Sequence, residues 1–541
     1  MERIRVMAET KAQNISNQLW AIANDLRGTM DASSFKDYIL PFLFYKYLSL
    51  RQEDYLVKGG LVDPVEGQSV NEAYKALVGD IGLADCLKDI TNELGYAINP
   101  EDTWASLTDN IHNGRVAPSD YQRLIDNFNK NAELNKEAAS DFRGIFNSVN
   151  LGNTGLGTTT TGRIKTLNAV VSKLDQIEYK DDAGRDILGE IYEYLIKMFA
   201  ANAGKKGGEF YTPHEVSIIL SKLVTFDLPS RKEDESFTVY DPTMGSGSLL
   251  LTVRNEVPNG DKQGVVHFYG QELNTVTYNL ARMNLMMHGV TYNNMDLRNG
   301  NTLDRDWPDG PDASGIDRPR SFDAVVANPP YSAKWDNNSN RMKDPRFSDY
   351  GKLAPASKAD YAFILHSLYH LNAKGTMAIV LPHGVLFRGA AEGIIRKTLI
   401  DKNYLDAVIG LPANLFYGTS IPTTILVFKK NRLRRDILFI DASREFIKSK
   451  NQNNLGQEHI DKIIETYKQR QDVDKYAHVA SLDEIKDNDY NLNIPRYVDT
   501  FEEEEEIDLV AVNRMLKEDE AEIAKLEKEV AEQMALLGIK E

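Results

Sequence analysis

Residues 237–248 read FTVYDPTMGSGS, and this stretch decides the fold. Its first part, from Phe237 to Tyr240, is rich in aromatic and β-branched residues and predicts a buried strand. The glycines that follow let the backbone approach a bound nucleotide, and the helix predicted to start there favours an anionic group. The turn therefore supplies candidate ligand-binding residues, which are Asp241, Gly245, Ser246 and Gly247.

Short strand-forming runs alternate with helical stretches downstream of this turn. This alternation predicts an α/β fold with a doubly wound, Rossmann-like sheet. The predicted strands are Phe237–Tyr240, Val265–Tyr269, Phe322–Val326, Thr376–Leu381, Leu405–Ile409 and Thr423–Phe428.

The remaining patterns predict four parts of the chain. Helical spacing indicates an N-terminal helical domain over residues 1–150, and a Gly/Thr-rich linker covers 151–165. The α/β domain covers 166–488, and a C-terminal segment with a helical tail covers 489–541. In the linker, Gly157 and Gly162 have the spacing of a phosphate-binding loop. Arg163 and Ile164 stand where that loop needs Lys and Ser or Thr, so we reject an NTPase site.

The composition excludes several classes of protein. None of the apolar stretches among the 541 residues is long enough to cross a bilayer, and the N-terminus lacks the apolar core of a secretory signal. We therefore expect a cytoplasmic protein without a membrane segment. The single cysteine, Cys86, has no partner for a disulfide, and no metal site is expected beside it.

The formal net charge of −17 argues against a protein that grips DNA through its own basic face. Residues 501–541 carry 14 acidic and 5 basic side chains, yet the rest of the chain is also acidic. Either the substrate is not DNA, or another subunit supplies most of the positive surface. In this tail, apolar residues recur every seven positions, at Leu509, Leu516, Ile523, Val530 and Leu537. That seam fits a helix packed on its own domain or one that contacts a partner.

Glu272 ends the strand that follows the glycine turn. A carboxylate in this position can accept hydrogen bonds from both hydroxyls of a ribose. Together with Asp241 it favours a cofactor that contains a nucleoside, either a dinucleotide or S-adenosylmethionine.

The motif Asn328-Pro329-Pro330-Tyr331 directly follows the predicted strand Phe322–Val326, at the edge where open α/β sheets bind ligands. An exocyclic amine attached to a base is a poor nucleophile, because its lone pair is delocalised into the ring. The Asn328 side-chain oxygen and the Pro329 carbonyl can accept its two hydrogens, while Pro330 rigidifies the turn. Tyr331 offers a face on which a planar base can stack.

In this order the motifs resemble those of the γ class of amino-methyltransferases, in which the cofactor motifs precede the catalytic one. The resemblance implies S-adenosylmethionine as cofactor and the N6 amine of a flipped adenine in DNA as methyl acceptor. It implies that Gly208-Glu209-Phe210-Tyr211-Thr212-Pro213 closes over the methionine moiety. It further implies that Asn301 and Phe363 contact the cofactor's adenine and that Phe416 contacts the flipped base opposite Tyr331.

Longer strings narrow the resemblance to the modification subunits of type I restriction-modification systems. They are Leu19–Gly28 and Tyr38–Pro41 for a helical N-terminal domain, Asp186–Leu195 for the start of the catalytic domain and Tyr490–Tyr497 for its end. The resemblance implies double-stranded DNA as substrate, and as partners a specificity subunit and a restriction subunit that is motor and nuclease. It also implies two copies of this chain in each complex.

Two alternative functions remain open from the sequence. The same four-residue motif also resembles methyltransferases that act on protein glutamine or on guanine in ribosomal RNA, since both substrates present a similar amine. A scaffold that retains the fold without activity is a further alternative, although intact Asn328 and Glu272 argue against it.

Overall fold

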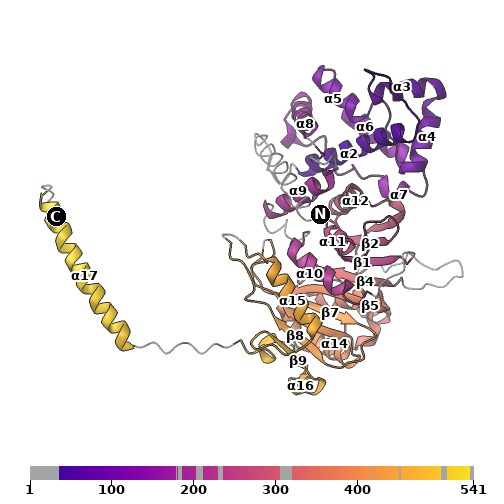
Figure 1. The fold of residues 1–541 in the computed structure, drawn as a ribbon. Coiled ribbons are helices and arrows are strands. Elements are labelled where there is room, and N and C mark those ends of the chain that lie inside the picture. The colour runs from indigo at the N-terminus through magenta and orange to yellow at the C-terminus, as the bar shows by residue number, and fades with distance from the viewer. Residues whose placement is uncertain are drawn as a thin grey trace. The chain divides into compact units, whose positions relative to one another are not determined.

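The computed structural model describes residues 36–177, 179–180, 186–202, 211–228, 235–304, 320–417, 419–449, 452–500 and 509–536 (Figure 1). Contacts within the chain divide it into two units, Met1–Val498 and Asp499–Glu541. None of the helices formed by the described residues is long and apolar enough to cross a membrane.

The first part of the larger unit is helical. Its central element is α2 (Lys36–Lys58), in which the side chains from Tyr38 to Ser49 are buried. Around it lie α3 (Val70–Ile81), α4 (Leu83–Leu94), α5 (Trp104–His112), α6 (Asp120–Ala132), α7 (Ala139–Phe142) and α8 (Thr160–Asp175).

A buried lysine joins two of these helices. Lys46 on α2 is 3% exposed, and its Nζ donates to the carbonyl oxygens of Leu174, at 2.8 Å, and Asp175, at 3.2 Å. These carbonyls end α8, where a cation compensates both the unpaired oxygens and the helix dipole. Burial lowers the pKa of Lys46 to about 8.

The structure corrects the predicted linker over 151–165. Residues Thr154–Leu156 form a 3-10 helix, and Thr160 begins α8. Thr159, which the sequence pattern places in a helix-breaking stretch, is the N-cap of α8. Its side chain accepts a hydrogen bond from the Gly162 backbone at 3.0 Å. Because α8 buries Leu167 and Val171 in the same core as α2, this stretch belongs to the helical part.

The second part of the larger unit is a nine-stranded mixed sheet of order β3-β2-β1-β4-β5-β7-β6-β8-β9. Strands β1 to β5 pair in parallel, whereas β7 pairs antiparallel with both β5 and β6. The strands are β1 (Phe237–Asp241), β2 (Val266–Glu272), β3 (Met295–Asn299), β4 (Phe322–Ala327), β5 (Leu371–Pro382), β6 (Leu405–Gly410), β7 (Thr423–Lys429), β8 (Ile437–Asp441) and β9 (Ala477–Ala480).

Helices cover both faces of this sheet, as the doubly wound prediction requires. Neighbouring strand residues alternate between two cores: Val239 and Val326 enter one, and Tyr240 and Val325 the other. The first core contains residues of α9 (Leu188–Asn202), α10 (His214–Thr225), α11 (Ser248–Glu256), α12 (Thr275–Met287) and α15 (Gln457–Gln469). The second contains residues of α13 (Asp360–Tyr369), α14 (Ala390–Asp401) and α16 (Leu482–Asp487).

All six predicted strands are present, and the predicted α/β class is confirmed. The sequence prediction lacked β3, β8 and β9, which are five residues long or shorter. It also began the C-terminal segment too early. Residues Leu492, Ile494 and Val498 are buried in the second core, so the stretch before 499 belongs to the sheet domain.

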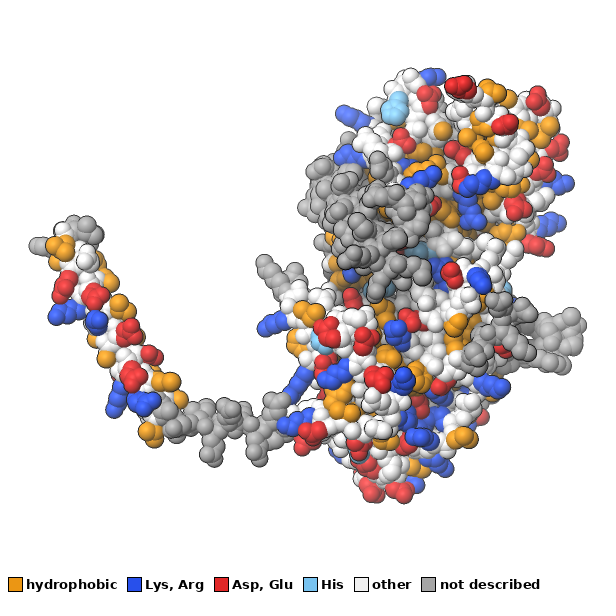
Figure 2. All heavy atoms as spheres, in the orientation of Figure 1, with side chains coloured by type: hydrophobic (Ala, Val, Ile, Leu, Met, Phe, Trp, Pro, Cys, Tyr) orange, Lys and Arg blue, Asp and Glu red, His pale blue; other side chains and the backbone are white. Residues whose placement is uncertain are grey.

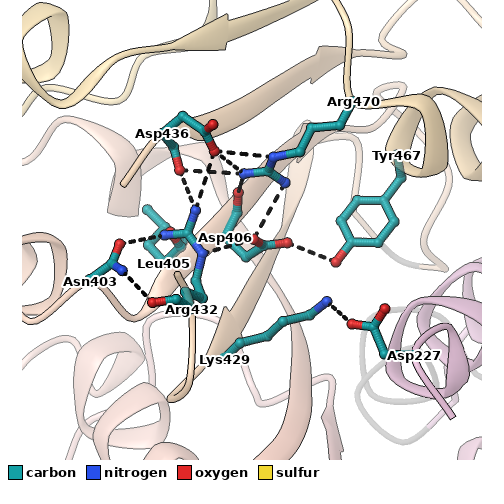
Figure 3. A network of polar contacts seen from close by, with 9 residues as sticks. All are labelled: Asp227, Asn403, Leu405, Asp406, Lys429, Arg432, Asp436, Tyr467 and Arg470. Atoms are coloured by element: carbon teal, nitrogen blue, oxygen red, sulfur yellow. Dashed lines mark hydrogen bonds and ion pairs between the residues drawn. The ribbon is translucent and has the colours of Figure 1, made fainter. Parts of the chain in front are cut away.

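A largely buried ion network connects β6 with the loop between β7 and β8 and with the C-terminal end of α15 (Figure 3). Asp406 on β6 accepts from Arg432 at 2.8 Å, and Arg470 lies 3.3 Å from the same oxygen. The Tyr467 hydroxyl on α15 donates to the other oxygen at 2.7 Å. Although burial opposes ionisation, Arg470 and Arg432 hold the pKa of Asp406 below its usual range.

We predict that Asp406→Ala lowers the free energy of unfolding by about 3 to 5 kcal/mol, because it leaves two largely buried arginines to share the single carboxylate of Asp436. Urea unfolding of the purified chain measures this loss. Asp54→Ala is the control, since it breaks only an exposed pair with Lys58, at 2.7 Å, and should cost less than about 1 kcal/mol. Equal losses would mean that the network is no stronger than a surface ion pair.

Candidate active site

The carboxyl ends of β1 and β2 bring the glycine turn and Glu272 together. One oxygen of Glu272 accepts the Gly245 backbone N–H at 3.2 Å, and the other accepts the Asn274 N–H at 2.8 Å. The Met244 N–H donates to the carbonyl of Gln271 at 3.0 Å, which ties the turn to the end of β2 a second time. The glycine turn and Glu272, both predicted to bind a nucleoside, are therefore connected by hydrogen bonds.

Asp241 lies at the end of β1 and is 2% exposed. One of its oxygens accepts the Thr243 backbone N–H at 2.9 Å. Burial, with a smaller contribution from the nearby charge of Glu272, raises the pKa of Asp241 to about 8. Burial also raises the pKa of Glu272. Two carboxyl groups that resist ionisation in one place favour a cationic or hydroxyl-rich ligand.

The turn between Asp241 and α11 requires glycine for two reasons. Gly245 and Gly247 have φ of +54° and +75°, in the left-handed region that other residues rarely adopt. A Cβ on Gly247 would also lie 2.5 Å from a side-chain carbon of Leu285 on α12. The backbone of the turn thus packs directly on the next helix. Ser246, 2% exposed, is held within it by its carbonyl, which accepts from Asn284 at 3.0 Å.

Asn301 and Phe363 lie at the other side of this turn. The Asn301 side chain accepts the Leu303 backbone N–H at 3.1 Å and donates to Asp304 at 2.7 Å. The neighbouring Thr302 hydroxyl donates to the carbonyl of Pro242 at 2.5 Å, which fastens this segment to the glycine turn. Phe363, on α13, is 6% exposed and shares the second core with Leu303.

Asn328 directly follows β4, next to β1 in the sheet. Its side-chain Nδ2 donates to the Thr212 hydroxyl at 3.1 Å. This bond orients the amide, because it directs the nitrogen to Thr212 and leaves the oxygen free to accept. It also joins two predicted site segments that are 116 positions apart in the sequence. Tyr211 and Pro213 are buried beside Thr212, whereas Gly208, Glu209 and Phe210 lie outside the described residues.

The oxygen of Asn328 has a partner within its own motif. The Tyr331 hydroxyl donates to Asn328 Oδ1 at 2.9 Å. Burial raises the pKa of Tyr331 well above its usual range, so the hydroxyl keeps its proton. Of the two prolines between them, Pro329 is buried and Pro330 is exposed. The acceptor predicted for a substrate amine is thus occupied by a protein donor in this structure.

Tyr331 and Phe416 contact each other directly. Their ring centroids are 6.0 Å apart, and the planes meet at 76°. The rings lie edge to face, so they do not form the two parallel walls that a sandwiched base would need. Phe416 is 4% exposed and follows β6 in the loop before β7.

A buried carboxylate stabilises the turn after Tyr331 by a hydrogen bond to its backbone. Ser332 has a φ of +54°, and its N–H donates to Asp360 at 2.9 Å. Asp360 is 1% exposed and forms an ion pair with Arg388, which also binds Glu392. The role of Asp360 was not predicted from the sequence, because nothing in the local pattern reveals a contact 28 positions away.

A second brace holds the loop that carries Phe416. Asn453 donates through its side chain to the Ala413 carbonyl and through its backbone to the Asn414 carbonyl, each at 2.9 Å. Gln452 donates to the Leu415 carbonyl. Neither residue was predicted from the sequence, because both come from a polar stretch beyond the predicted strands. The string Gln452-Asn453-Asn454 was the available signal.

The arrangement places three chemical functions along one edge of the sheet. Asp241 and Glu272 offer carboxyl groups, Asn328 and Pro329 offer neutral acceptors, and aromatic rings from Tyr331 and Phe416 lie next to them. Within the described residues, no three His, Cys, Asp or Glu side chains gather as a metal site would require. Such an edge suits transfer of a group from a nucleoside-containing cofactor to a planar amine.

Two family models match the chain. One, described as N-6 DNA Methylase, matches residues 183–506, and the other, the HsdM N-terminal domain, matches 15–174. The second match ends close to the C-terminus of α8, in agreement with the corrected boundary of the helical part.

Curated relatives cover nearly the whole chain. The methylase subunit of the type I restriction enzyme MpnII of Mycoplasma pneumoniae is 38% identical over 515 residues, which are 93% of this chain and 92% of that protein. The methylase subunit of MjaIX from Methanocaldococcus jannaschii is 28% identical and covers 96% of the chain and 91% of its own length.

A solved structure resembles the fold closely. The type I restriction-modification methyltransferase subunit from Streptococcus thermophilus superposes with a TM-score of 0.80 at 45% identity. The match covers 90% of this chain and all of that one.

Proposed function

The chain belongs to the N-6 DNA methylase family and, within it, to the methylase subunits of type I restriction enzymes; on this premise we propose how its residues perform the reaction. The proposal is transfer of a methyl group from S-adenosylmethionine to the N6 amine of an adenine flipped out of DNA. The observation that carries it is the position of Asn328 on the same sheet edge as Asp241 and Glu272.

The residues at the ends of β1 and β2 fit the proposed cofactor. Glu272 accepts hydrogen bonds from the ribose hydroxyls, and Asp241 compensates the positive charge of the methionine moiety. Asn301 and Phe363 hold the adenine, and the segment 208–213 covers the methionine end. S-adenosylmethionine supplies an activated methyl group on a cationic sulfur when it is bound.

Asn328 and Pro329 prepare the amine for attack. Their two oxygens accept the two amino hydrogens, which draws the nitrogen lone pair out of the ring plane and toward the methyl group. The Tyr331 hydroxyl lies 2.9 Å from Asn328 Oδ1 and takes one of the two lone pairs of that oxygen, so the oxygen is fully available to the base once the hydroxyl leaves. We therefore propose that Tyr331 turns when the base enters, and that this movement converts its edge contact with Phe416 into two faces for stacking.

The alternative substrates are set aside by family membership. Protein glutamine and ribosomal RNA were open from the motif alone, but the N-6 DNA methylase model matches residues 183–506 and the curated relatives are restriction-enzyme methylase subunits. A scaffold without activity would not need Asn328 held by Thr212 with its oxygen directed at the Tyr331 hydroxyl.

The chain works as part of an assembly with DNA. Its net charge of −17 repels a duplex, so a more basic specificity subunit must supply most of the phosphate contacts. We propose two copies of this chain beside one specificity subunit, joined for restriction by a motor and nuclease subunit.

The tail helix is proposed as the contact to that assembly. Helix α17 (Leu509–Leu536) exposes apolar side chains along its length, and Figure 2 shows them at its surface. Leu516, Ile523 and Val530 are 52%, 56% and 56% exposed. They repeat every seven residues, which is the spacing that lets one helix pack along another. Leu537, the last residue of the predicted seam, lies outside the described residues.

We predict that Asn328→Ala reduces methyl transfer at least about a hundredfold, because it removes an acceptor that acts on the reacting amine. Affinity for S-adenosylmethionine should stay within about twofold, since Asn328 does not hold the cofactor. Transfer of tritiated methyl to target DNA by the complete complex measures the first effect, and calorimetry measures the second.

Tyr331→Phe is the matched control for this variant. It keeps the ring and removes only the hydroxyl that occupies Asn328 Oδ1, so transfer should be retained within a few-fold. A loss as large as that of Asn328→Ala would contradict the assignment of Tyr331 as a stacking residue. Lost cofactor binding in folded Asn328→Ala would contradict the assignment of Asn328.

We predict that cofactor binding at pH 7 releases about one proton, because a cationic ligand must ionise Asp241, whose pKa is raised to about 8 in the free protein. The sign follows directly: below pH 8 the carboxyl is mostly neutral, so affinity increases as the pH rises toward that value. Calorimetry in buffers with different ionisation enthalpies counts the protons. Asp241→Asn should remove the release, and a wild-type protein that binds without releasing protons would refute the role of Asp241.

We predict that Ile523→Asp weakens assembly with the specificity subunit at least tenfold, because it places a charge in the apolar seam. Lys528→Asp, on the polar face of the same helix, should change assembly less than about threefold. Co-purification and gel shifts with target DNA measure both, and cofactor binding should be unaffected in each. Tight, sequence-specific DNA binding by the single chain would contradict the need for a partner.

A further inference from the structure

Arg346 is almost completely buried, and the mechanism above does not use it. The side chain is 2% exposed and lies in the segment between β4 and α13. Asp344 compensates its charge in a forked contact, with Nε at 3.0 Å from one carboxylate oxygen and Nη2 at 2.6 Å from the other. A buried guanidinium is costly unless every donor has an acceptor, so its other partners indicate its role.

The other donors of Arg346 bind the backbone next to Asn301, one of the residues assigned to the cofactor. Nη1 donates to the Thr302 carbonyl at 2.8 Å, and Nη2 donates to the Leu303 carbonyl at 3.2 Å. These two residues directly follow Asn301, so the guanidinium holds the turn that carries it. Nη1 also lies 3.0 Å from Nδ1 of His366.

The contact with Arg346 determines the proton on His366. Because a guanidinium only donates, Nδ1 of His366 must accept, and the ring is neutral with its hydrogen on Nε2. Burial lowers the pKa of His366 well below its usual range, which agrees with a neutral ring. Nε2 lies 2.7 Å from the Tyr240 hydroxyl and donates to it. The hydroxyl in turn donates to Oε1 of Gln271 at 2.5 Å.

Each member of this buried polar chain, Arg346–His366–Tyr240–Gln271, adjoins a residue assigned to the cofactor. Tyr240 precedes Asp241, and Gln271 precedes Glu272. Arg346 binds the carbonyls that follow Asn301, and His366 lies one helical turn after Phe363 on α13. The hydrogen bonds run in one direction from Arg346 to Gln271. One continuous series of hydrogen bonds therefore connects the surroundings of Asp241, Glu272, Asn301 and Phe363.

We propose that this buried polar chain positions the cofactor-binding residues, and that its members are positioning residues for S-adenosylmethionine. The inference rests on the proposed function. An apolar core would fill the same space at lower cost, but it would not specify the spacing between three strand ends and a helix. Directional hydrogen bonds do so, and they hold Asp241, Glu272 and Asn301 in place before the cofactor arrives.

Tyr240→Phe is the variant that tests the chain. It removes one hydroxyl and keeps the ring, which packs on Phe322 with centroids 4.7 Å apart. We expect the Kd for S-adenosylmethionine, measured by calorimetry on the complete chain, to rise about five- to tenfold. In the complete complex, the KM for the cofactor should rise by the same factor, whereas kcat at saturating cofactor and DNA affinity should stay within about twofold.

Tyr467→Phe is the matched control. Tyr467 is 4% exposed, and its hydroxyl donates to Asp406 at 2.7 Å in the network of Figure 3. Asp406 lies on β6, which β4, β5 and β7 separate from β1 in the sheet. It should lower Tm about as much as Tyr240→Phe and leave the Kd for the cofactor within twofold. Arg346→Lys, which keeps the charge but has too few donors for both carbonyls and His366, should weaken cofactor binding at least as much as Tyr240→Phe.

The outcomes separate this inference from the proposed function. Glu272→Ala, measured in the same series, tests the cofactor site itself, and a wild-type chain that does not bind S-adenosylmethionine would overturn the proposed function. If wild type binds and Glu272→Ala weakens binding, unchanged affinity in Tyr240→Phe would overturn only the positioning role. Equal weakening by Tyr240→Phe and Tyr467→Phe would also overturn it, because the effect would then reflect general stability.

Discussion

The parallel pairing of β1 with β4 is the constraint on which the whole site depends. Val239 is opposite Ala324 and Tyr240 is opposite Val325, so the two strands end at the same edge. This register brings Asp241, at the end of β1, and Asn328, directly after β4, to the same edge, where we propose that the first holds the cofactor and the second acts on the substrate. Because β1 and β4 also mark the point where the strand order reverses, the edge between them is open to ligands.

Polar contacts rather than apolar packing set the fine geometry of this edge. Thr212 orients Asn328, Asp360 holds the backbone after Tyr331, and Asn453 holds the loop before Phe416. Each brace comes from a segment far away in the sequence, so the site is complete only when the whole sheet domain is folded. The Tyr331 hydroxyl donates to the oxygen that we propose as the acceptor for the substrate amine, so base entry in the proposed function involves a rearrangement within the motif.

The sequence predicted those parts of the structure that local chemistry determines. Strand-forming runs predicted six of the strands, and the glycine turn, Glu272 and Asn328 were assigned from residue types at strand ends. The short strand β3 and the braces from Thr212, Asp360 and Asn453 were not predictable, because each depends on a partner brought near by the fold. The linker over 151–165 was wrong for a related reason: whether Thr159 ends a loop or caps a helix is decided by the packing of α8 on the core.

In the proposed function, Asn328 Oδ1 exchanges the Tyr331 hydroxyl for the amine of a flipped adenine. The most direct measurement is a structure of the complete complex with target DNA and a cofactor analogue that cannot donate its methyl group. We expect the adenine N6 within hydrogen-bond distance of Asn328 Oδ1 and the Pro329 carbonyl, with Tyr331 turned onto the base. A flipped adenine bound elsewhere, with Tyr331 still donating to Asn328, would contradict it.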